Sequence, residues 1–180
     1  MLIEAMTAAS ELVDENIRKD FLIIGGASAR CARHIDIAVT AETLNAFVEK
    51  AETDPRFKKH PDDEWTYTTQ EEGIEGLVVR FEFLDLGGPF VPKMHGMTKF
   101  GAVRVASLAD IVLMKALAYQ SRGEKNDFDD MKFALGLMAQ KGETFQEYKF
   151  KPGEVMIIKD VAETSDMETK NLLAQVARDI

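Results

Sequence analysis

Residues 21–39 read FLIIGGASARCARHIDIAV, and this stretch decides how the rest of the chain is interpreted. Its first four residues are apolar and predict a buried strand that ends at Gly25-Gly26. A short segment with two arginines follows, and then a second apolar run with Asp36 at its centre. A strand, a diglycine turn and a second strand with an acid on one face suit a phosphate-bearing ligand.

The second apolar run, residues 34–39, alternates between two kinds of side chain. Successive residues of a strand point to opposite faces of the sheet. We therefore expect one face to turn towards the core, made by Ile35, Ile37 and Val39. The other face should turn towards a cleft, and it carries His34, Asp36 and Ala38.

Composition limits the class of protein. With 180 residues and 46% apolar content, the chain fits a single domain over residues 1–180 with a proper core. No apolar run approaches the roughly 20 residues that span a bilayer, so no membrane is expected. The acidic, amphipathic first 20 residues are unlike a targeting segment, and a single cysteine, Cys31, fits a reducing, cytoplasmic location. A net charge of −9 weighs against extended nucleic-acid binding.

Outside the opening stretch, hydrophobic spacing predicts further elements in the first half of the chain. Residues 2–18 have helical spacing, and Thr40 is placed to cap a helix over 41–52. A polar loop is expected at 54–64, and a long loop or irregular hairpin rich in glycine and proline is expected at 87–101. The predicted strands are 65–69, 77–86 (the longest) and 103–105.

The long strand is also divided by face. Val79, Phe81 and Phe83 share one side with Asp85, whereas Arg80 and Glu82 lie on the other. An arginine and a glutamate in an apolar strand are costly unless they are paired, exposed or used in a site. A neighbour pair at a sheet edge and a role in a site both remain open.

The last third of the chain is predicted to be helical. Ser107 with Asp110 indicates a capped helix, and a second helix is expected over 127–139. Two matches to the Ser/Thr-x-x-Glu capping box then predict two more helices, at Thr144 with Glu147 and at Ser165 with Glu168.

Five segments in this order resemble the nucleotidyltransferase superfamily, in particular its small abortive-infection-type and fungal nucleotidyltransferase-like proteins. They are FLIIGGAS after a helix, an arginine just before HIDIAV, VVRFEFLDL, SLADIVLMKALA and SRGEKNDFDDMKFAL. The match runs over roughly residues 15–140. The resemblance implies an α/β (α+β) fold in which a short mixed sheet is flanked by helices. The core covers about 15–140, followed by a helical tail over 141–180.

The resemblance also implies a site. In the family a Gly-Gly or Gly-Ser turn holds nucleotide phosphates, and three acids on two neighbouring strands bind two magnesium ions. Gly25, Gly26 and Ser28 match the turn, Asp36 matches the second acid, and Glu82 is the best match to the third. Asp85 ranks lower because it shares the face of Phe81 and Phe83. Lys115, with Arg122 and Asp127, matches family positions in the helical tail, where binding the cofactor and a structural role are both open.

Two departures from the family concern the same site. His34 replaces the first acid of the Asp-x-Asp pair, and neutral imidazole is a poor magnesium ligand. The link is also short, with seven residues between Gly26 and His34, where family members usually fit a fuller helix. Both changes affect the surroundings of Asp36.

Three functions remain open. The first is transfer of a nucleoside monophosphate from an NTP to a small-molecule or protein hydroxyl, with Asp36 and Glu82 as metal ligands and catalytic acids. It would use Mg²⁺, or alternatively Mn²⁺ or another divalent cation. The second is an altered or degenerate site, a pseudoenzyme that binds a nucleotide, another small molecule or a protein partner. The third is acid–base chemistry in the same cleft with His34 as a catalytic residue.

Overall fold

A computed structural model describes residues 2–25, 34–62, 64–70, 72–73, 75–91 and 93–177. The chain divides into two compact units. Unit 1 is Met1–Val91 with Thr98–Val105, and unit 2 is Pro92–Met97 with Ala106–Ile180. The expectation of one domain with a core over 15–140 and a tail over 141–180 stays a prediction.

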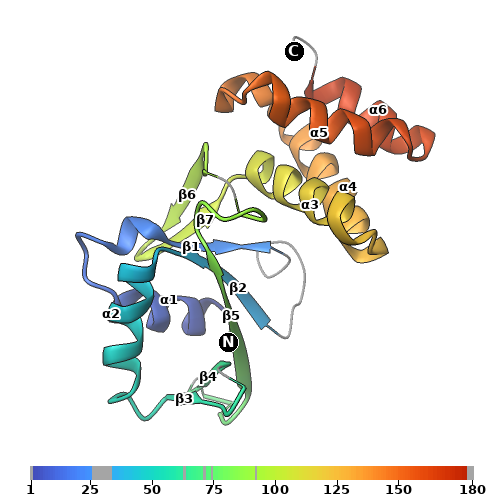
Figure 1. Ribbon diagram of the computed structural model, residues 1–180. Coiled ribbons are helices and arrows are strands. Elements are labelled where there is room, and N and C mark those ends of the chain that lie inside the picture. Colours follow the sequence, from blue (N-terminus) through green and yellow to red (C-terminus); the bar gives the residue numbers. More distant parts are fainter. Residues whose placement is uncertain are drawn as a thin grey trace. The chain divides into compact units, whose positions relative to one another are not determined.

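Unit 1 is built on a mixed sheet (Figure 1). Among the described residues the sheet has seven strands in the order β3-β4-β5-β2-β1-β7-β6. β2 is antiparallel to β1 and parallel to β5, and β1 is parallel to β7. The strands are β1 (Phe21–Ile24), β2 (His34–Val39), β3 (Phe57–Lys59), β4 (Trp65–Thr68), β5 (Val78–Asp85), β6 (Met97–Phe100) and β7 (Val103–Ala106). The predicted α/β class with a short mixed sheet is confirmed.

Two helices pack on one face of this sheet, α1 (Leu2–Leu12) and α2 (Ala41–Ala51). Thr40 caps α2 as predicted, since its hydroxyl accepts a hydrogen bond from Thr43 N at 3.3 Å. The core between helices and sheet contains the predicted inward residues of β2 and β5, together with Phe47 of α2. This packing leaves His34, Asp36 and Glu82 on the opposite face of their strands, because side chains alternate along a strand.

Two predictions about unit 1 elements were wrong, the end of the first helix and the loop at 54–64. The first helix ends at Leu12 instead of residue 18, because the Arg18 guanidinium takes the Val13 carbonyl at 2.8 Å in place of a backbone amide. The loop predicted at 54–64 contains a short strand, β3, and the loop or irregular hairpin predicted at 87–101 contains β6, which pairs with β7. β3 buries only one of its three residues and β6 buries none, so neither has an alternating pattern, and both depend on pairing within the sheet.

Unit 2 contains four α-helices among its described residues: α3 (Leu108–Arg122), α4 (Lys125–Lys141), α5 (Pro152–Glu163) and α6 (Met167–Val176). The Ser107 cap of α3 was predicted correctly. At Thr144 only a 3-10 helix forms, η3 (Phe145–Tyr148), and the next helix starts at Pro152. α6 is capped by Asp166 and not by Ser165, because the Asp166 carboxylate accepts from Thr169 N at 2.8 Å.

Over the ranges that the structure describes, no helix combines the length and apolar character that a membrane crossing requires.

Candidate functional site

The register of three strands in unit 1 places Asp36 at the centre of the candidate site. Asp36 lies opposite Ile24 of antiparallel β1 and beside Glu82 of parallel β5. Residues paired in a parallel register point to the same face, so the carboxylates of Asp36 and Glu82 lie side by side. The strand order therefore brings together two acids that are 46 positions apart in the sequence.

His34 completes a group of three metal-ligating side chains. It lies two residues before Asp36 on the same face of β2, and its Nε2 is 3.3 Å from Asp36 Oδ1. One ligating atom from each of His34, Asp36 and Glu82 lies within 4.8 Å of the other two. The Asp36 side chain is only 14% exposed, whereas that of His34 is 54% exposed. The group thus opens to solvent on the His34 side.

These three residues fit a divalent cation. An ion with ligands at about 2.1 Å separates neighbouring ligand atoms by about 3 Å. One ligating atom from each residue already lies within 4.8 Å of the other two, and all three side chains lie on one face of the sheet. Asp36 and Glu82 supply the oxygen ligands that hard cations take, and His34 supplies one nitrogen.

Gly25 lies against the carboxylate of Asp36. Its φ of +76° is in the left-handed region, which favours glycine. A Cβ at this position would overlap Asp36 Oδ2 and lie 3.0 Å from Asp36 Cγ. The predicted phosphate turn therefore begins with a residue that must lack a side chain so that the backbone can approach the acid.

The other predicted phosphate-turn residues, Gly26 and Ser28, lie outside the described residues. The structure therefore describes only the first residue of that turn. Their role as nucleotide-binding residues stays a prediction.

Lys115 belongs to an ion-pair network inside unit 2. Its Nζ lies 3.2 Å from Asp127 Oδ1 and 3.1 Å from Asp130 Oδ2, and Arg122 Nε donates to Asp127 Oδ2 at 2.6 Å. Burial lowers the pKa of Lys115, but the hydrogen bond and charge of Asp130, with Asp127, outweigh it and raise that pKa above its usual value. The network links α3 to α4, and the predicted cofactor-binding role of Lys115 stays a prediction.

Arg80 is a residue of this region to which the family resemblance gave no role. It lies in register beside His34, and its Nη1 is 3.6 Å from Glu64 Oε2. The side chain is 65% exposed, so its cationic group lies at the surface, where it pairs with Glu64. The sequence singled out Arg80 because a charged residue is unexpected in an otherwise apolar strand. In the structure Arg80 pairs with Glu64 instead of Glu82.

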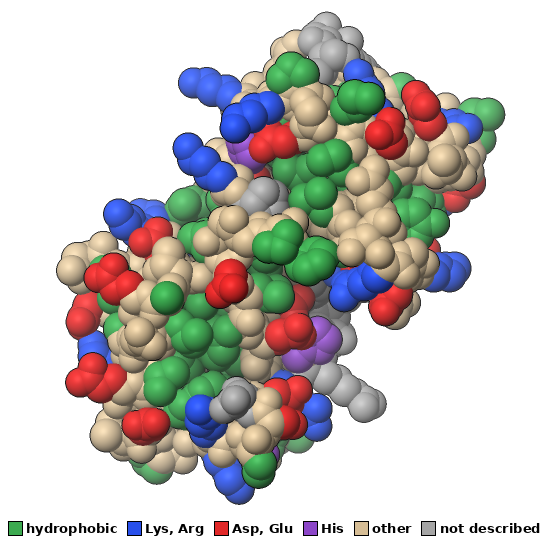
Figure 2. Space-filling model, viewed as in Figure 1, with side chains coloured by type: hydrophobic (Ala, Val, Ile, Leu, Met, Phe, Trp, Pro, Cys, Tyr) green, Lys and Arg blue, Asp and Glu red, His purple; other side chains and the backbone are tan. Residues whose placement is uncertain are grey.

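A hollow of about 430 Å³ lies beside Glu82. Figure 2 shows apolar side chains gathered on unit 1 in the region of α2 and β5, with acidic side chains around them. β4 begins at Trp65, opposite Phe81, so β5 extends beyond it and its edge opens here. The apolar lining residues are Leu44, Val48, Trp65, Phe81 and Phe83, and the charged ones are Lys59, Asp62, Glu64 and Glu82.

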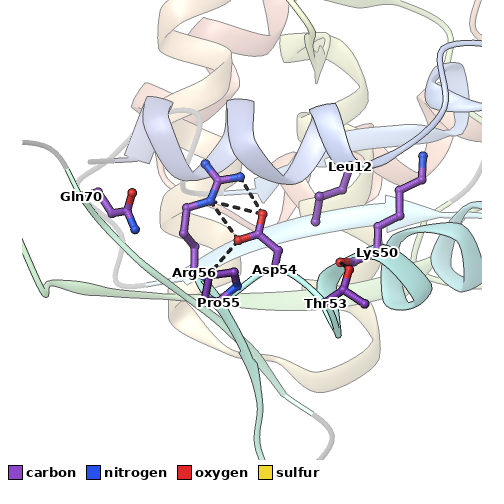
Figure 3. Close-up of a pocket in the computed structure, with 7 residues that line it drawn as sticks. All are labelled: Leu12, Lys50, Thr53, Asp54, Pro55, Arg56 and Gln70. Atoms are coloured by element: carbon purple, nitrogen blue, oxygen red, sulfur yellow. Dashed lines mark hydrogen bonds and ion pairs between the residues drawn. The ribbon is translucent and has the colours of Figure 1, made fainter.

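A second hollow in unit 1, of about 490 Å³, is lined by two cationic side chains that already have carboxylate partners (Figure 3). Arg56 forms a bidentate pair with Asp54, with Nη2 2.7 Å from Oδ2. Lys50 pairs with Asp14 at 2.5 Å. Both cations that line the hollow are thus neutralised by carboxylates, and we assign no ligand to it.

Comparison with solved structures shows which known folds this chain is similar to. No protein-family model matches the sequence, and neither does any curated protein. The crystal structure of an antigenic nucleotidyltransferase-like protein from Paracoccidioides brasiliensis superposes with a TM-score of 0.56 at 16% identity. The alignment covers 96% of this chain and 85% of that one. The fold is nucleotidyltransferase-like.

A bacterial structure is also similar over nearly the whole chain. JHP933 from Helicobacter pylori has a TM-score of 0.53 at 15% identity, over 97% of this chain and 87% of that one. At such identities the likeness concerns the fold alone. The predicted resemblance to the nucleotidyltransferase superfamily is confirmed at this level.

Proposed function

We propose that unit 1 is an altered nucleotidyltransferase site that binds a nucleoside triphosphate together with a divalent cation. The observation that supports it best is the convergence of His34, Asp36 and Glu82 within 4.8 Å on one face of the sheet. A nucleotide triphosphate carries several negative charges, and two carboxylates alone would repel it. A divalent cation held by Asp36 and Glu82 would offset that repulsion.

Each residue near Asp36 has a part in this proposal. Asp36 and Glu82 would hold the cation, with His34 as the third ligand. Gly25 leaves room for the backbone beside Asp36, because a Cβ at that position would overlap the carboxylate. Arg80 lies at the surface in register with His34 and pairs with Glu64 at 3.6 Å; it would exchange that partner to contact the phosphates.

The experiment is a titration of ATP, CTP, GTP and UTP with Mg²⁺ or Mn²⁺ that follows thermal unfolding. At a ligand concentration of about 100 dissociation constants, binding adds about 2.7 kcal/mol to the free energy of unfolding. For a chain of this length that raises Tm by about 5–10 °C. The rise should need both nucleotide and cation, and should disappear in Asp36→Ala.

The chain offers a matched control for this test. Asp85 is an exposed acid three residues after Glu82 on the same strand, but it points to the other face. Asp85→Ala should keep the rise in Tm that Glu82→Ala loses. If no combination of nucleotide and cation changes Tm in the wild-type chain, the proposal is wrong.

Nucleotidyl transfer is the second candidate function, and the hollow beside Glu82 favours it. An acceptor held there would present a hydroxyl next to the Glu82 carboxylate. That carboxylate would take the hydroxyl proton while the oxygen attacks the α-phosphorus. The bond from the α-phosphorus to the bridging oxygen would break, and pyrophosphate would leave with the electron pair. The acceptor and the preferred nucleobase are not assigned here. Acid–base chemistry by His34, a protein partner and a cytoplasmic location remain predictions.

Pyrophosphate release separates transfer from binding alone. The assay uses the full chain with each NTP, Mg²⁺ or Mn²⁺, and a panel of small hydroxyl compounds. Release that depends on an acceptor and is lost in Glu82→Gln, but kept in Asp85→Asn, supports transfer. A nucleotide-dependent rise in Tm without release under any condition would leave a binding protein.

A further inference from the structure

His34 differs from the other two histidines in what surrounds its ring. His60 Nε2 contacts the Thr66 hydroxyl at 3.1 Å. In unit 2, His95 directs its two nitrogens to two separate carboxylates, Nδ1 to Asp110 at 3.0 Å and Nε2 to Glu154 at 3.2 Å. Among the described residues, only His34 forms a group in which one nitrogen and two carboxylates can meet a single ion.

The charge of this group matches one divalent cation. Asp36 and Glu82 contribute two negative charges and a neutral imidazole contributes none. The guanidinium of Arg80, in register with His34, already pairs with Glu64 at 3.6 Å, so this pair leaves the balance of two negative charges unchanged. A second cation would therefore meet repulsion that these residues do not offset.

The ligand atoms also discriminate between cations. Mg²⁺ prefers oxygen ligands and gives up its water reluctantly, whereas imidazole suits transition metals. For a site with mixed nitrogen and oxygen ligands, affinity rises from Mn²⁺ through Co²⁺. The half-exposed position of His34 lets the ring turn towards an ion held between Asp36 and Glu82.

We infer that His34 is a direct metal ligand that makes the site bind one transition-metal cation, Mn²⁺ or Co²⁺, in preference to Mg²⁺. The inference rests on the cation site of the proposed function and adds its stoichiometry and selectivity. It concerns the metal alone and needs neither nucleotide nor acceptor.

The first test is calorimetric titration of the metal-free full chain with Mg²⁺, Mn²⁺ and Co²⁺ without nucleotide. We expect one site per chain, and tighter binding of Co²⁺ and Mn²⁺ than of Mg²⁺. Pulsed EPR of the Mn²⁺ form should show coupling to a directly bound ¹⁴N nucleus. Equal affinity for Mg²⁺ and Co²⁺, two sites per chain, or no nitrogen coupling would each overturn the inference.

Two variants identify the residue. His34→Asp replaces nitrogen by oxygen and adds a charge, so the ratio of Co²⁺ to Mg²⁺ affinity should fall at least tenfold, since even groups that only support a ligand change metal affinity by about 10–100-fold. The ¹⁴N coupling should disappear with it. His60→Ala should keep both the ratio and the coupling. An unchanged ratio in a folded His34→Asp chain contradicts the inference.

These outcomes are separable from those of the proposed function. A nucleotide-dependent rise in Tm with Mg²⁺, in a chain that shows no preference for Co²⁺, overturns the inference and leaves the proposed function. Selective binding of Co²⁺ without any response to nucleotide supports the inference and overturns the proposed function.

Discussion

At the residue scale, the approach of Gly25 to Asp36 couples backbone conformation to the candidate site. The left-handed φ of Gly25 and its proximity to the carboxylate are two separate constraints. The first affects stability, and the second affects the orientation of a proposed metal ligand. A control glycine that has only the first constraint can therefore separate them.

Gly25→Ala should lower the free energy of unfolding by about 1–3 kcal/mol through backbone strain. It should also abolish cation-dependent changes in Tm, because the new methyl group displaces the Asp36 carboxylate. Gly101 has a φ of +61° with open space around it. Gly101→Ala should have a similar cost in denaturant unfolding but keep the response to cation. Retention of that response in Gly25→Ala would contradict the role given to this contact.

A second residue-scale effect is the low pKa of Glu4. Its carboxylate accepts hydrogen bonds from the hydroxyls of Tyr67 and Thr69 and from Gln70 N at 3.0 Å. Burial acts to raise the pKa of Glu4, but these hydrogen bonds outweigh it and lower the pKa to about 2. The acid ties α1 to β4 and to the residues after it.

Unit 1 should therefore lose stability in acid, when the Glu4 carboxylate becomes protonated. Because the folded-state pKa lies below the ordinary value of 4.5, its contribution is complete above about pH 4.5 and is lost as pH falls towards 2. Glu4→Gln should cost about 1.5–3 kcal/mol at pH 7 and remove this part of the pH dependence. Glu11→Gln, at an exposed position of the same helix, should change neither quantity in urea unfolding at pH 7 and pH 3. An unaltered pH dependence in Glu4→Gln would refute the assignment.

At the element scale, the first residues of α3 cap the helix and also hold the segment at His95 and Gly96 by hydrogen bonds. Ser107 Oγ accepts from Asp110 N at 3.1 Å, as the capping pattern predicted. The buried Asp110 carboxylate also accepts from His95 N and Gly96 N, both at 2.9 Å, and from Ser107 Oγ at 2.6 Å. The helix start thus holds the segment before β6.

Asp110→Ala should lower the free energy of unfolding by about 3–5 kcal/mol, because it leaves the buried Ser107 hydroxyl and the part-buried amides of His95 and Gly96 without their acceptor. Asp129→Ala is the matched control, since Asp129 pairs with Lys125 on the exposed surface of a helix. Such pairs contribute about 0.3–0.5 kcal/mol. Chemical denaturation measures both variants, and similar losses in the two would show that Asp110 does not hold this segment.

At the scale of the whole molecule, the net charge of −9 predicts poor binding to nucleic acids. Non-specific binding comes mainly from cations that release counterions from phosphates. We expect the dissociation constant for duplex DNA to exceed about 0.1 mM at 0.15 M salt. Fluorescence anisotropy with a labelled duplex measures it. Micromolar binding that weakens steeply with added salt would disprove this expectation.

The sequence alone determined the features that depend on local periodicity. Alternation along residues 34–39 and 78–85 assigned faces to His34, Asp36 and Glu82, and it ranked Glu82 above Asp85. Each side chain of a strand takes its face from its own position, so no distant contact is needed for such a prediction. The caps at Thr40 and Ser107 were equally local, because the bonding residues are three positions apart.

Only the tertiary structure decided which residues meet. Register between β2 and β5 put Glu82 beside Asp36, and the end of β1 put Gly25 against the same acid. In unit 2, Lys115 forms ion pairs with Asp127 and Asp130. β3 and β6 have no alternating hydrophobic pattern and are strands because they pair with neighbouring strands of the sheet. These outcomes depend on partners far apart in the chain, whose contact is set by packing and hydrogen bonding of the whole sheet or helix pair. Local periodicity carries no information about them.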